Sequence, residues 1–250
     1  MQAMLHSAGS IHLPHTTMSL HHTPRPQWLT FDCYGTLIQW DEGLQAVFAE
    51  ILQAKNASHI DPATLIAVYD RHEHALEQSP PHRSFREVSG TALRLALAEL
   101  GLPSQADDGQ RLTERIGAMP PFPEVVGALQ QLKARGYRLC IISNTDDDII
   151  AGNVAQLGGT IDRVITAQQG GAYKPARQLF DHAYQQLGVS KDEIVHICAS
   201  PHLDHAAARD IGFRCVWIDR GRRSPLPDYT PDATLPTLAG VPALFDSLGW

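Results

Sequence analysis

Short apolar runs alternate with helix-like segments through the second half of this sequence, and that alternation restricts the fold more than any other feature. After the Pro-rich segment 119–123, the helix-like EVVGALQQLKARG precedes the apolar run YRLCIIS, and FDHAYQQLG precedes EIVHICAS and CVWID. The runs at 138–142 and 194–198 are apolar at nearly every position, which is typical of strands buried on both faces. Helices alternating with such strands predict an α/β fold, a Rossmann-like parallel sheet covered on both sides.

A first strand lies far ahead of the others in the chain. The segment WLTF at 28–31 is aromatic and β-branched, whereas residues from 44 to 117 show the apolar spacing of three and four that is typical of amphipathic helices. A chain of 250 residues exceeds one typical domain without reaching two full-sized ones. We therefore expect an α/β core formed by residues 28–43 and 118–250, with residues 44–117 inserted as a helical cap.

Composition excludes several classes of function. The formal net charge of -7 and the pI near 6.0 lack the excess of Lys and Arg that nucleic-acid binding requires. No apolar run approaches the roughly 20 residues of a membrane span.

Residues 1–27 hold no acidic residue, three prolines and five histidines, and are predicted to be a disordered extension rather than a secretory signal. The four cysteines show no CxxC spacing, which argues against a zinc site or a disulfide framework and favours the cytoplasm.

Polar residues follow several of the expected strands at the point where each strand ends. Asp32 follows the first strand, Ser143 and Asn144 follow a second, and Ser200 and Asp204 follow a later one. Because ligands bind beyond the carboxyl ends of the strands in open α/β sheets, we expect these residues to converge on one site. Taken singly, each also has an ordinary structural explanation as a loop cap or a helix cap.

Four segments in a fixed order make a more specific pattern. They are DCYGTL at 32–37, SNTDDD at 143–148, YKP at 173–175 and SPHLD at 200–204. From Trp28 onward, this order of segments resembles the haloacid dehalogenase superfamily. The resemblance implies a Rossmann-like core with an inserted helical cap.

Three charged residues of these segments would carry the chemistry. The resemblance implies that the carboxylate of Asp32 attacks the substrate as a nucleophile, and that Lys174 neutralises this carboxylate and lowers its pKa. Asp204 would orient Lys174 and the hydrolytic water. If the chain is a phosphatase, Asp204 would instead ligate Mg²⁺ together with Asp32.

Hydroxyl and amide groups of the same segments would hold the substrate. Ser143, Asn144 and Thr36 offer donors suited to a carboxylate or a phosphate, and Ser200 lies in the last of the four segments. We count Ser143 with the catalytic residues and the other three with the substrate-binding ones.

The residue two positions after Asp32 separates two reactions. Phosphatases of the superfamily typically have a second Asp there, which protonates a departing alkoxide, whereas this chain has Tyr34. Halide leaves without protonation, and DxYGTL resembles the type II 2-haloacid dehalogenases. That resemblance implies hydrolysis of a short 2-haloacid through an ester on Asp32, with Tyr34 at the substrate and no cofactor. The alternative is a Mg²⁺-dependent phosphatase acting on a small phosphate ester.

The helical cap is expected to close over a small substrate and to supply a cation for its carboxylate or for the departing halide. Arg71, Arg83 and Arg86 are the candidates, with Arg71 taken as the substrate-binding residue, because a guanidinium pairs bidentately with a carboxylate. The alternative for each is a solvated arginine on an amphipathic helix.

Two positions depart from the type II pattern. Where those enzymes have a Ser-Ser-Asn group before the last Asp, this chain has Ala199, Ser200 and Pro201. Phe180 stands where those enzymes have a Tyr. Both changes remove groups that hold the Lys and the water, so a catalytically silent binding protein is a further alternative. His202 or His205 would be a substitute polar group, with a helix-start histidine as the ordinary explanation. We expect a small-molecule substrate and no nucleic-acid or membrane partner, and a homodimer is compatible with the sequence.

Overall fold

The structure, a computed structural model, describes Leu20 and residues 23–250. Most of the predicted disordered extension, residues 1–19 and 21–22, lies outside the described residues. The described part of that stretch contacts the core, because Leu20 is buried and the Gln27 side chain donates to Glu193 across 2.7 Å. The chain therefore meets the core before the first strand begins.

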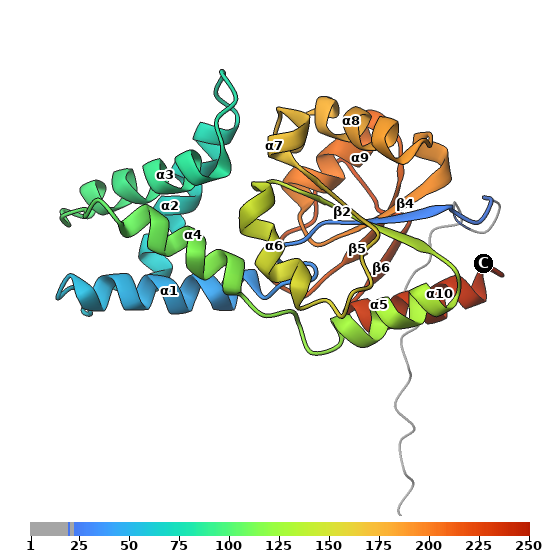
Figure 1. The fold of residues 1–250 in the computed structure, drawn as a ribbon, viewed down its shortest axis with the longest axis horizontal. Coiled ribbons are helices and arrows are strands. Elements are labelled where there is room, and N and C mark those ends of the chain that lie inside the picture. The colour runs from blue at the N-terminus through green and yellow to red at the C-terminus, as the bar shows by residue number, and fades with distance from the viewer. Residues whose placement is uncertain (1–19, 21–22) are drawn as a thin grey trace, which may run out of the picture.

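Six parallel strands form one sheet in the order β3-β2-β1-β4-β5-β6 (Figure 1). The strands are β1 (Trp28–Phe31), β2 (Arg138–Ser143), β3 (Arg163–Thr166), β4 (Ile194–Cys198), β5 (Arg214–Ile218) and β6 (Ala233–Leu235). The chain runs from β1 outward to β3 and then returns to the other side of β1 as β4. This reversal is the place where open α/β sheets bind ligands. The predicted α/β class with a parallel sheet is confirmed.

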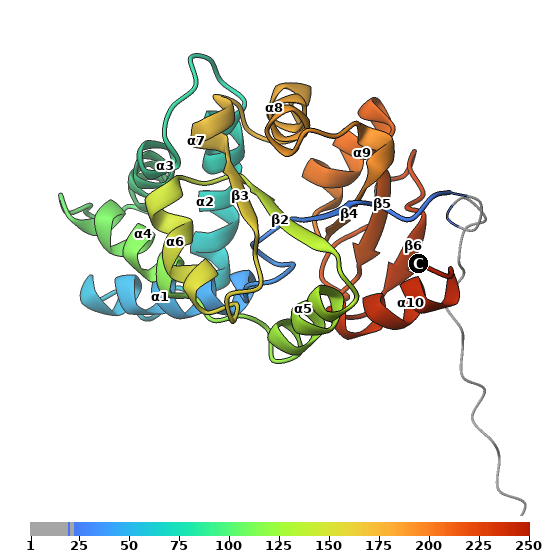
Figure 2. The same ribbon diagram turned by 45° about the vertical axis from the view of Figure 1, so that its right-hand side comes forward.

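Helices cover both faces of the sheet (Figures 1 and 2). One face carries α5 (Val125–Ala134) and α10 (Val241–Ser247), and the other carries α8 (Arg177–Leu187) and α9 (Ala206–Ile211). In β2, Leu139 and Ile141 pack into the core with α5 and α10, while Cys140 and Ile142 pack with α8 and α9. Because both faces are buried, the strand is apolar at successive positions.

Four helices from the middle of the chain lie together beside the sheet (Figure 1). They are α1 (Trp40–Ala54), α2 (Pro62–Glu77), α3 (Phe85–Glu99) and α4 (Asp108–Ala118), and together they are called the helical layer here. Side-chain caps start two of them: Asp61 accepts from the Ala63 N–H, and Ser84 and Glu87 form a capping box. The range 44–117 predicted to be helical contains these helices joined by the non-helical segments 55–61, 78–84 and 100–107, and α1 starts four residues before position 44.

The helical layer is attached to the edge of the sheet where the strands end. Asp146, after β2, accepts hydrogen bonds of 2.9 Å from the backbone N–H groups of both Phe85 and Arg86 at the start of α3. Tyr173 donates its hydroxyl to the Arg83 carbonyl at 2.8 Å. These contacts hold the turn between α2 and α3 above the carboxyl ends of the strands.

The remaining elements are short or connect the strands. They are α6 (Asp147–Ala155), α7 (Ala167–Gly170), the 3₁₀ helices η2 (Lys191–Glu193) and η4 (Leu238–Gly240), and the π-helix η3 (Pro201–His205). No helix in the described part of the chain has the length and apolar character needed to cross a bilayer.

Candidate active site

The carboxyl ends of the strands border a cavity of about 350 Å³. Five of the predicted site residues line it: Asp32, Tyr34, Ser143, Asn144 and Ser200. A volume near the lower end of the range for ligand pockets, about 300 to 1,000 Å³, suits a small molecule. The structure thus brings together the residues that follow different strands, as the sheet argument predicted.

Asp32 is held at the floor of this cavity by two hydrogen bonds. Its Oδ1 accepts from Lys174 Nζ at 2.7 Å and its Oδ2 accepts from Thr36 Oγ1 at 2.7 Å. Thr36 Oγ1 also accepts from the Ala199 N–H at 2.8 Å, so Thr36 lies behind the carboxylate and braces it. A turn through Gly35, at φ +82°, brings Thr36 back to the carboxylate. The orientation of the Asp32 carboxylate is therefore fixed before any substrate binds.

Lys174 is fully buried and bridges two carboxylates. Its Nζ lies 2.7 Å from Asp32 Oδ1 and 2.8 Å from Asp204 Oδ1. Burial alone would lower the pKa of Lys174, but the negative charges of Asp204 and Asp32 raise it above its ordinary value. Asn144 Oδ1 accepts from the Lys174 backbone N–H at 2.7 Å and fixes the chain at this point. The ammonium group remains charged.

The pKa values of the two carboxyl groups move apart. Burial raises the pKa of Asp32 above its ordinary value, with the charge of Lys174 opposing the rise and that of Asp204 adding to it. Burial acts the same way on Asp204, but there Lys174 and a hydrogen bond from His196 outweigh it and lower the pKa of Asp204 to about 2. Asp204 is therefore a fixed negative charge, and Asp32 carries the more reactive carboxylate.

His196 belongs to this site, and the sequence interpretation missed it. Its Nε2 lies 3.0 Å from Asp204 Oδ1 and its Nδ1 lies 2.8 Å from Thr30 Oγ1. The residue is fully buried in the middle of β4. The sequence indicated it by a single polar residue inside the apolar run IVHIC. A buried imidazole requires hydrogen-bond partners, so a histidine in a buried strand is expected to bond other polar groups.

Ser143 lines the cavity with an unused hydrogen-bonding group. Its Oγ is buried and has no partner among residues 20 and 23–250. Asn144 also lines the cavity, and its amide donates to Glu77 Oε2 at 3.3 Å. A substrate oxygen would satisfy the Ser143 hydroxyl, as the sequence analysis expected for this segment.

Tyr34 occupies the position that distinguishes the two candidate reactions. Its ring lines the cavity, and its hydroxyl donates to Asn153 Oδ1 at 3.0 Å. Burial raises the pKa of Tyr34 well above its ordinary value. A neutral phenol already engaged with an amide is a poor proton donor to a leaving group.

Acidic side chains of α2 form part of the cavity wall. Asp70, Glu73 and Glu77 all line it. Burial raises the pKa of Glu73 to about 8, and burial also raises the pKa of Glu77 well above its ordinary value. At neutral pH Glu73 is therefore mostly a neutral carboxylic acid, and this wall is less negative than its sequence implies.

Three arginines after β5 supply positive charge to the cavity. Arg220, Arg222 and Arg223 line it, and none was among the candidates named from the sequence. Arg220 donates to the Thr36 carbonyl at 2.8 Å and stacks over the Phe122 ring. The sequence did indicate them, because the run RGRR directly follows an expected strand, and residues at the carboxyl ends of strands are expected at the site.

Arg222 and Arg223 also join the core to the helical layer. Arg222 pairs with Glu42 at 2.5 Å, and Arg223 pairs with Asp41 at 2.6 Å, both acidic residues lying in the first turn of α1. These ion pairs form at the border of the cavity, so a substrate anion would compete with them for the guanidinium groups.

The arginines predicted for substrate binding lie elsewhere. Arg71, with its side chain 58% exposed, pairs with Glu99 at 2.6 Å. Arg83 donates to the Ser79 carbonyl, and Arg86 bonds Thr113 and Asp148. None of the three lines the cavity in the described part of the chain, because Arg71 lies on an exposed face of α2, Arg83 in the loop between α2 and α3, and Arg86 in the first turn of α3. The structure does not bring Arg71 to the site.

The donor set around Asp32 and Asp204 fits an ammonium group better than a shared metal ion. Lys174 Nζ lies within 2.8 Å of the Oδ1 atoms of both residues, so a Mg²⁺ ion held by both would have to use their Oδ2 atoms. Asp204 is fully buried and does not line the cavity. The ammonium group therefore occupies the Oδ1 side of both carboxylates, and Asp204 does not face the cavity in which a phosphate ester would bind.

One departure from the type II pattern, Phe180, lies next to His196, and the other, Pro201, lies in the segment that carries Asp204. Phe180 stacks on Phe213, with ring centroids 4.9 Å apart, and meets the His196 ring edge-on at 5.8 Å. Pro201 starts the π-helix η3 that carries Asp204. His196 bonds Asp204 here, and of the two histidines considered as substitutes, His202 lines the cavity whereas His205 is buried behind it.

Comparisons with known proteins agree with this geometry. A family model described as haloacid dehalogenase-like hydrolase matches residues 27–212. The chain is 31% identical over 160 residues to haloacetate dehalogenase H-2 of Moraxella sp. (strain B), covering 63% of this chain and 71% of the relative. It is 28% identical over 229 residues to an (S)-2-haloacid dehalogenase of Pseudomonas sp. (strain YL), covering 88% and 94%.

Solved structures share the fold. A crystal structure of an L-2-haloacid dehalogenase matches with a TM-score of 0.79 at 23% identity, covering 89% of this chain and 100% of that one. The Xanthobacter autotrophicus L-2-haloacid dehalogenase with chloropropionic acid covalently bound matches with a TM-score of 0.74 at 20% identity, covering 88% and 98%. Identities at this level support the arrangement of the elements.

Proposed function

This chain belongs to the haloacid dehalogenase-like hydrolases, and we propose that within that family it removes halide from a short 2-haloacid by displacement at carbon. The observation that carries the proposal is the Asp32 carboxylate in the cavity, held by Lys174 and Thr36, with Tyr34 rather than a carboxylic acid two positions later. A nucleophile with no proton donor beside it suits a leaving group that departs as a stable anion.

The first step forms an ester. An oxygen of the Asp32 carboxylate attacks the carbon that bears the halogen, a C–O bond forms, and the C–X bond breaks with both electrons leaving on the halide. Lys174 neutralises the carboxylate in the free enzyme, and the fixed position of Asp32 removes much of the entropic cost of the attack. No proton moves in this step and no cofactor takes part.

The second step restores Asp32. Water adds to the carbonyl carbon of the ester, the negative charge develops next to the Lys174 ammonium, and the bond from that carbon to the substrate oxygen breaks. The 2-hydroxyacid leaves with one proton of the water, the other proton is released to solvent, and the oxygen of that water stays on the Asp32 carboxylate. Asp204 and His196 act as positioning residues because they hold Lys174 in place.

The substrate carboxylate would bind between the strand ends and the arginines. Ser143 offers a free hydroxyl, Asn144 offers an amide, and Arg222 offers a charge at the cavity border. Because burial keeps Glu73 mostly protonated at neutral pH, the wall formed by α2 does not repel an anion strongly. We further propose that the helical layer acts as a cap that excludes water from the first step.

Halide release tests this function. Purified protein is incubated with chloroacetate and with each enantiomer of 2-chloropropionate, with and without EDTA, beside an Asp32→Asn variant. Halide release that survives EDTA and is lost in Asp32→Asn is expected. Phosphate release from a generic phosphate ester that requires Mg²⁺ would support the phosphatase instead, and inactivity with every haloacid and every phosphate ester would support the silent binding protein.

A further inference from the structure

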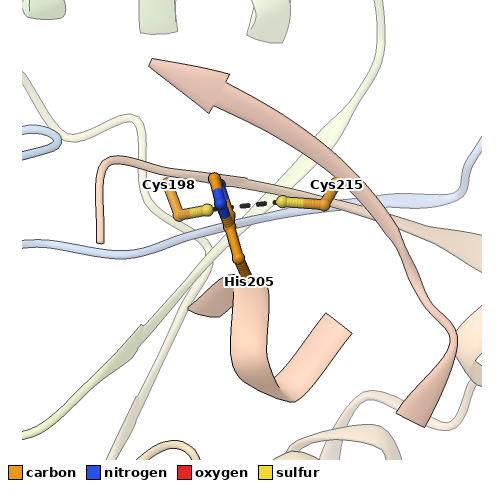
Figure 3. Close-up of side chains that lie close together, drawn as sticks. All are labelled: Cys198, His205 and Cys215. Carbon is orange, nitrogen blue, oxygen red and sulfur yellow. Dashed lines mark hydrogen bonds between the residues drawn. The ribbon is translucent and has the colours of Figure 1, made fainter. Parts of the chain in front are cut away.

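Two cysteines and a histidine lie close together behind the active site (Figure 3). Cys198 ends β4, Cys215 lies on the neighbouring strand β5, and His205 ends the π-helix η3. The two Sγ atoms are 3.4 Å apart, and one ligand atom from each of the three residues lies within 4.8 Å of the others. All three side chains are fully buried, and the proposed reaction uses none of them.

His205 makes no hydrogen bond of good geometry that would explain its burial, and it interacts with the Cys215 thiol beside it. Both of its ring nitrogens are buried, and neither makes a hydrogen bond within the described residues. The ring packs between Trp217 and Tyr229, with both centroid distances 5.3 Å. Buried polar groups in proteins nearly always have a partner, because losing water without a replacement costs free energy. A metal ion, which binds the lone pair of an imidazole nitrogen, would supply such a partner.

We propose that Cys198, His205 and Cys215 bind one Zn²⁺ ion. Thiolate sulfur and imidazole nitrogen are the donors that zinc prefers, with Zn–S distances of about 2.3 Å that place two sulfurs of a tetrahedral site just under 4 Å apart. The observed Sγ separation of 3.4 Å needs only a small opening to reach that value. Binding releases one proton from each thiol, and the two thiolates then cancel the charge of the ion.

Charge and surroundings agree with this assignment. A neutral set of one Zn²⁺, two thiolates and one imidazole, with a water molecule as the fourth ligand of the tetrahedron, suits a fully buried position against the rings of Trp217 and Tyr229. A hard cation such as Mg²⁺ prefers oxygen donors and would not replace it.

The four cysteines show no CxxC spacing, and for that reason the sequence did not predict a zinc site. Here six residues separate Cys198 from His205 and nine separate His205 from Cys215, so the ligands come from two strands and the helix between them. Adjacent parallel strands bring the two thiols together, which a search for close spacing in the sequence does not detect.

The zinc ion would also hold part of the active site. His205 directly follows Asp204 in η3, and Cys198 lies two residues after His196 on β4. A metal bound at these points would tie η3 to β4 and β5 and keep Asp204 against Lys174. Its role is positional, and it does not depend on which substrate the cavity takes.

X-ray absorption at the zinc edge tests the ligand set directly. The full chain is purified under reducing conditions and loaded with one equivalent of Zn²⁺. Two sulfur neighbours and at least one imidazole nitrogen are expected. A shell of nitrogen and oxygen alone would overturn the proposal, because it would place the metal on other histidines, such as the five in residues 1–27.

Variants provide the matched control. Cys198→Ala and Cys215→Ala are expected to lose the sulfur shell and the rise in Tm that Zn²⁺ gives, whereas Cys140→Ala, at a buried cysteine of β2 outside the group, keeps both. If the first two variants do not fold, thiolate-to-cobalt charge-transfer absorption in wild-type protein loaded with Co²⁺ is the independent measurement, and its absence overturns the proposal. A Cys198–Cys215 disulfide in protein isolated anaerobically would also overturn it.

Discussion

Lys174 Nζ lies 2.7 Å from Asp32 Oδ1 although 142 positions separate the two residues in the sequence. Both residues are almost completely buried, so the protein rather than bulk water must supply most of the stabilisation of each charge. In such a place each charge needs the other, and the arrangement persists only because Asp204 shares the ammonium. The geometry therefore ties catalysis and stability to the same contact.

Replacing Lys174 by Met should damage both properties. The variant leaves two buried carboxylates without their cation, and we expect the free energy of unfolding to fall by about 3 to 5 kcal/mol. Halide release should fall at least about 100-fold because the charge beside the nucleophile is gone. Lys191→Met, at a lysine with its side chain 40% exposed, is the control for urea unfolding and should change stability by less than about 0.5 kcal/mol. A fully active, stable Lys174→Met variant would contradict the proposed role.

The pH profile of kcat/KM should have an acid limb set by Asp32. Only the ionised carboxylate attacks, and burial raises the pKa of Asp32 above its ordinary value of 3.8. Halide release should therefore decline, as pH falls, at a higher pH than an exposed Asp would produce. An acid limb at or below that ordinary value would show that the carboxylate is better stabilised than the geometry implies.

Glu73 should make the protein less stable as pH rises. The native pKa of Glu73 is about 8 because of burial, against 4.5 for the unfolded chain, so the native state binds more protons between these values. This contribution to stability is complete below about pH 4.5 and is lost as pH rises through about 8.

Glu73→Gln removes that pH dependence and provides its test. Urea unfolding at pH 5 and pH 9 should show a smaller loss of stability in the variant than in wild type, by an amount on the order of a few kcal/mol. Glu114→Gln, at an exposed position of α4, should follow wild type. Equal losses in all three proteins would mean that Glu73 is ionised in the native state.

Substitution of a cavity-lining arginine and of an exposed arginine should have different effects on KM. Arg222 lines the cavity, whereas Arg71 is paired with Glu99 on an exposed helix surface. Arg222→Gln should raise KM for 2-chloropropionate about 10-fold with a smaller change in kcat, the equivalent of about 1.4 kcal/mol of binding. Arg71→Gln should leave both constants unchanged. The reverse pattern would return Arg71 to the site and imply a different arrangement of the helical layer.

The sequence predicted the parts of the molecule that depend on local pattern. Apolar runs such as 138–142 indicated strands buried on both faces, and the polar residues at their ends converged because parallel strands share one carboxyl edge. Arg71, predicted to bind the substrate, lies away from the cavity, because the helical period shows which face is apolar and does not show where the opposite face points. His196 and Arg220 were missed, although each left a signal in the sequence, because their partners include Thr30 and Thr36, which are distant in the chain.

Oxygen transfer from water tests the central proposal most directly. Protein in excess over 2-chloropropionate completes one turnover in H₂¹⁸O, and the mass of the peptide that contains Asp32 is then measured. Attack by Asp32 on carbon, followed by hydrolysis at the ester carbonyl, predicts one ¹⁸O atom in the Asp32 carboxylate and none in the first equivalent of hydroxyacid. Label in the product with none on Asp32 would mean that water attacks the carbon itself, and the ester mechanism would be wrong.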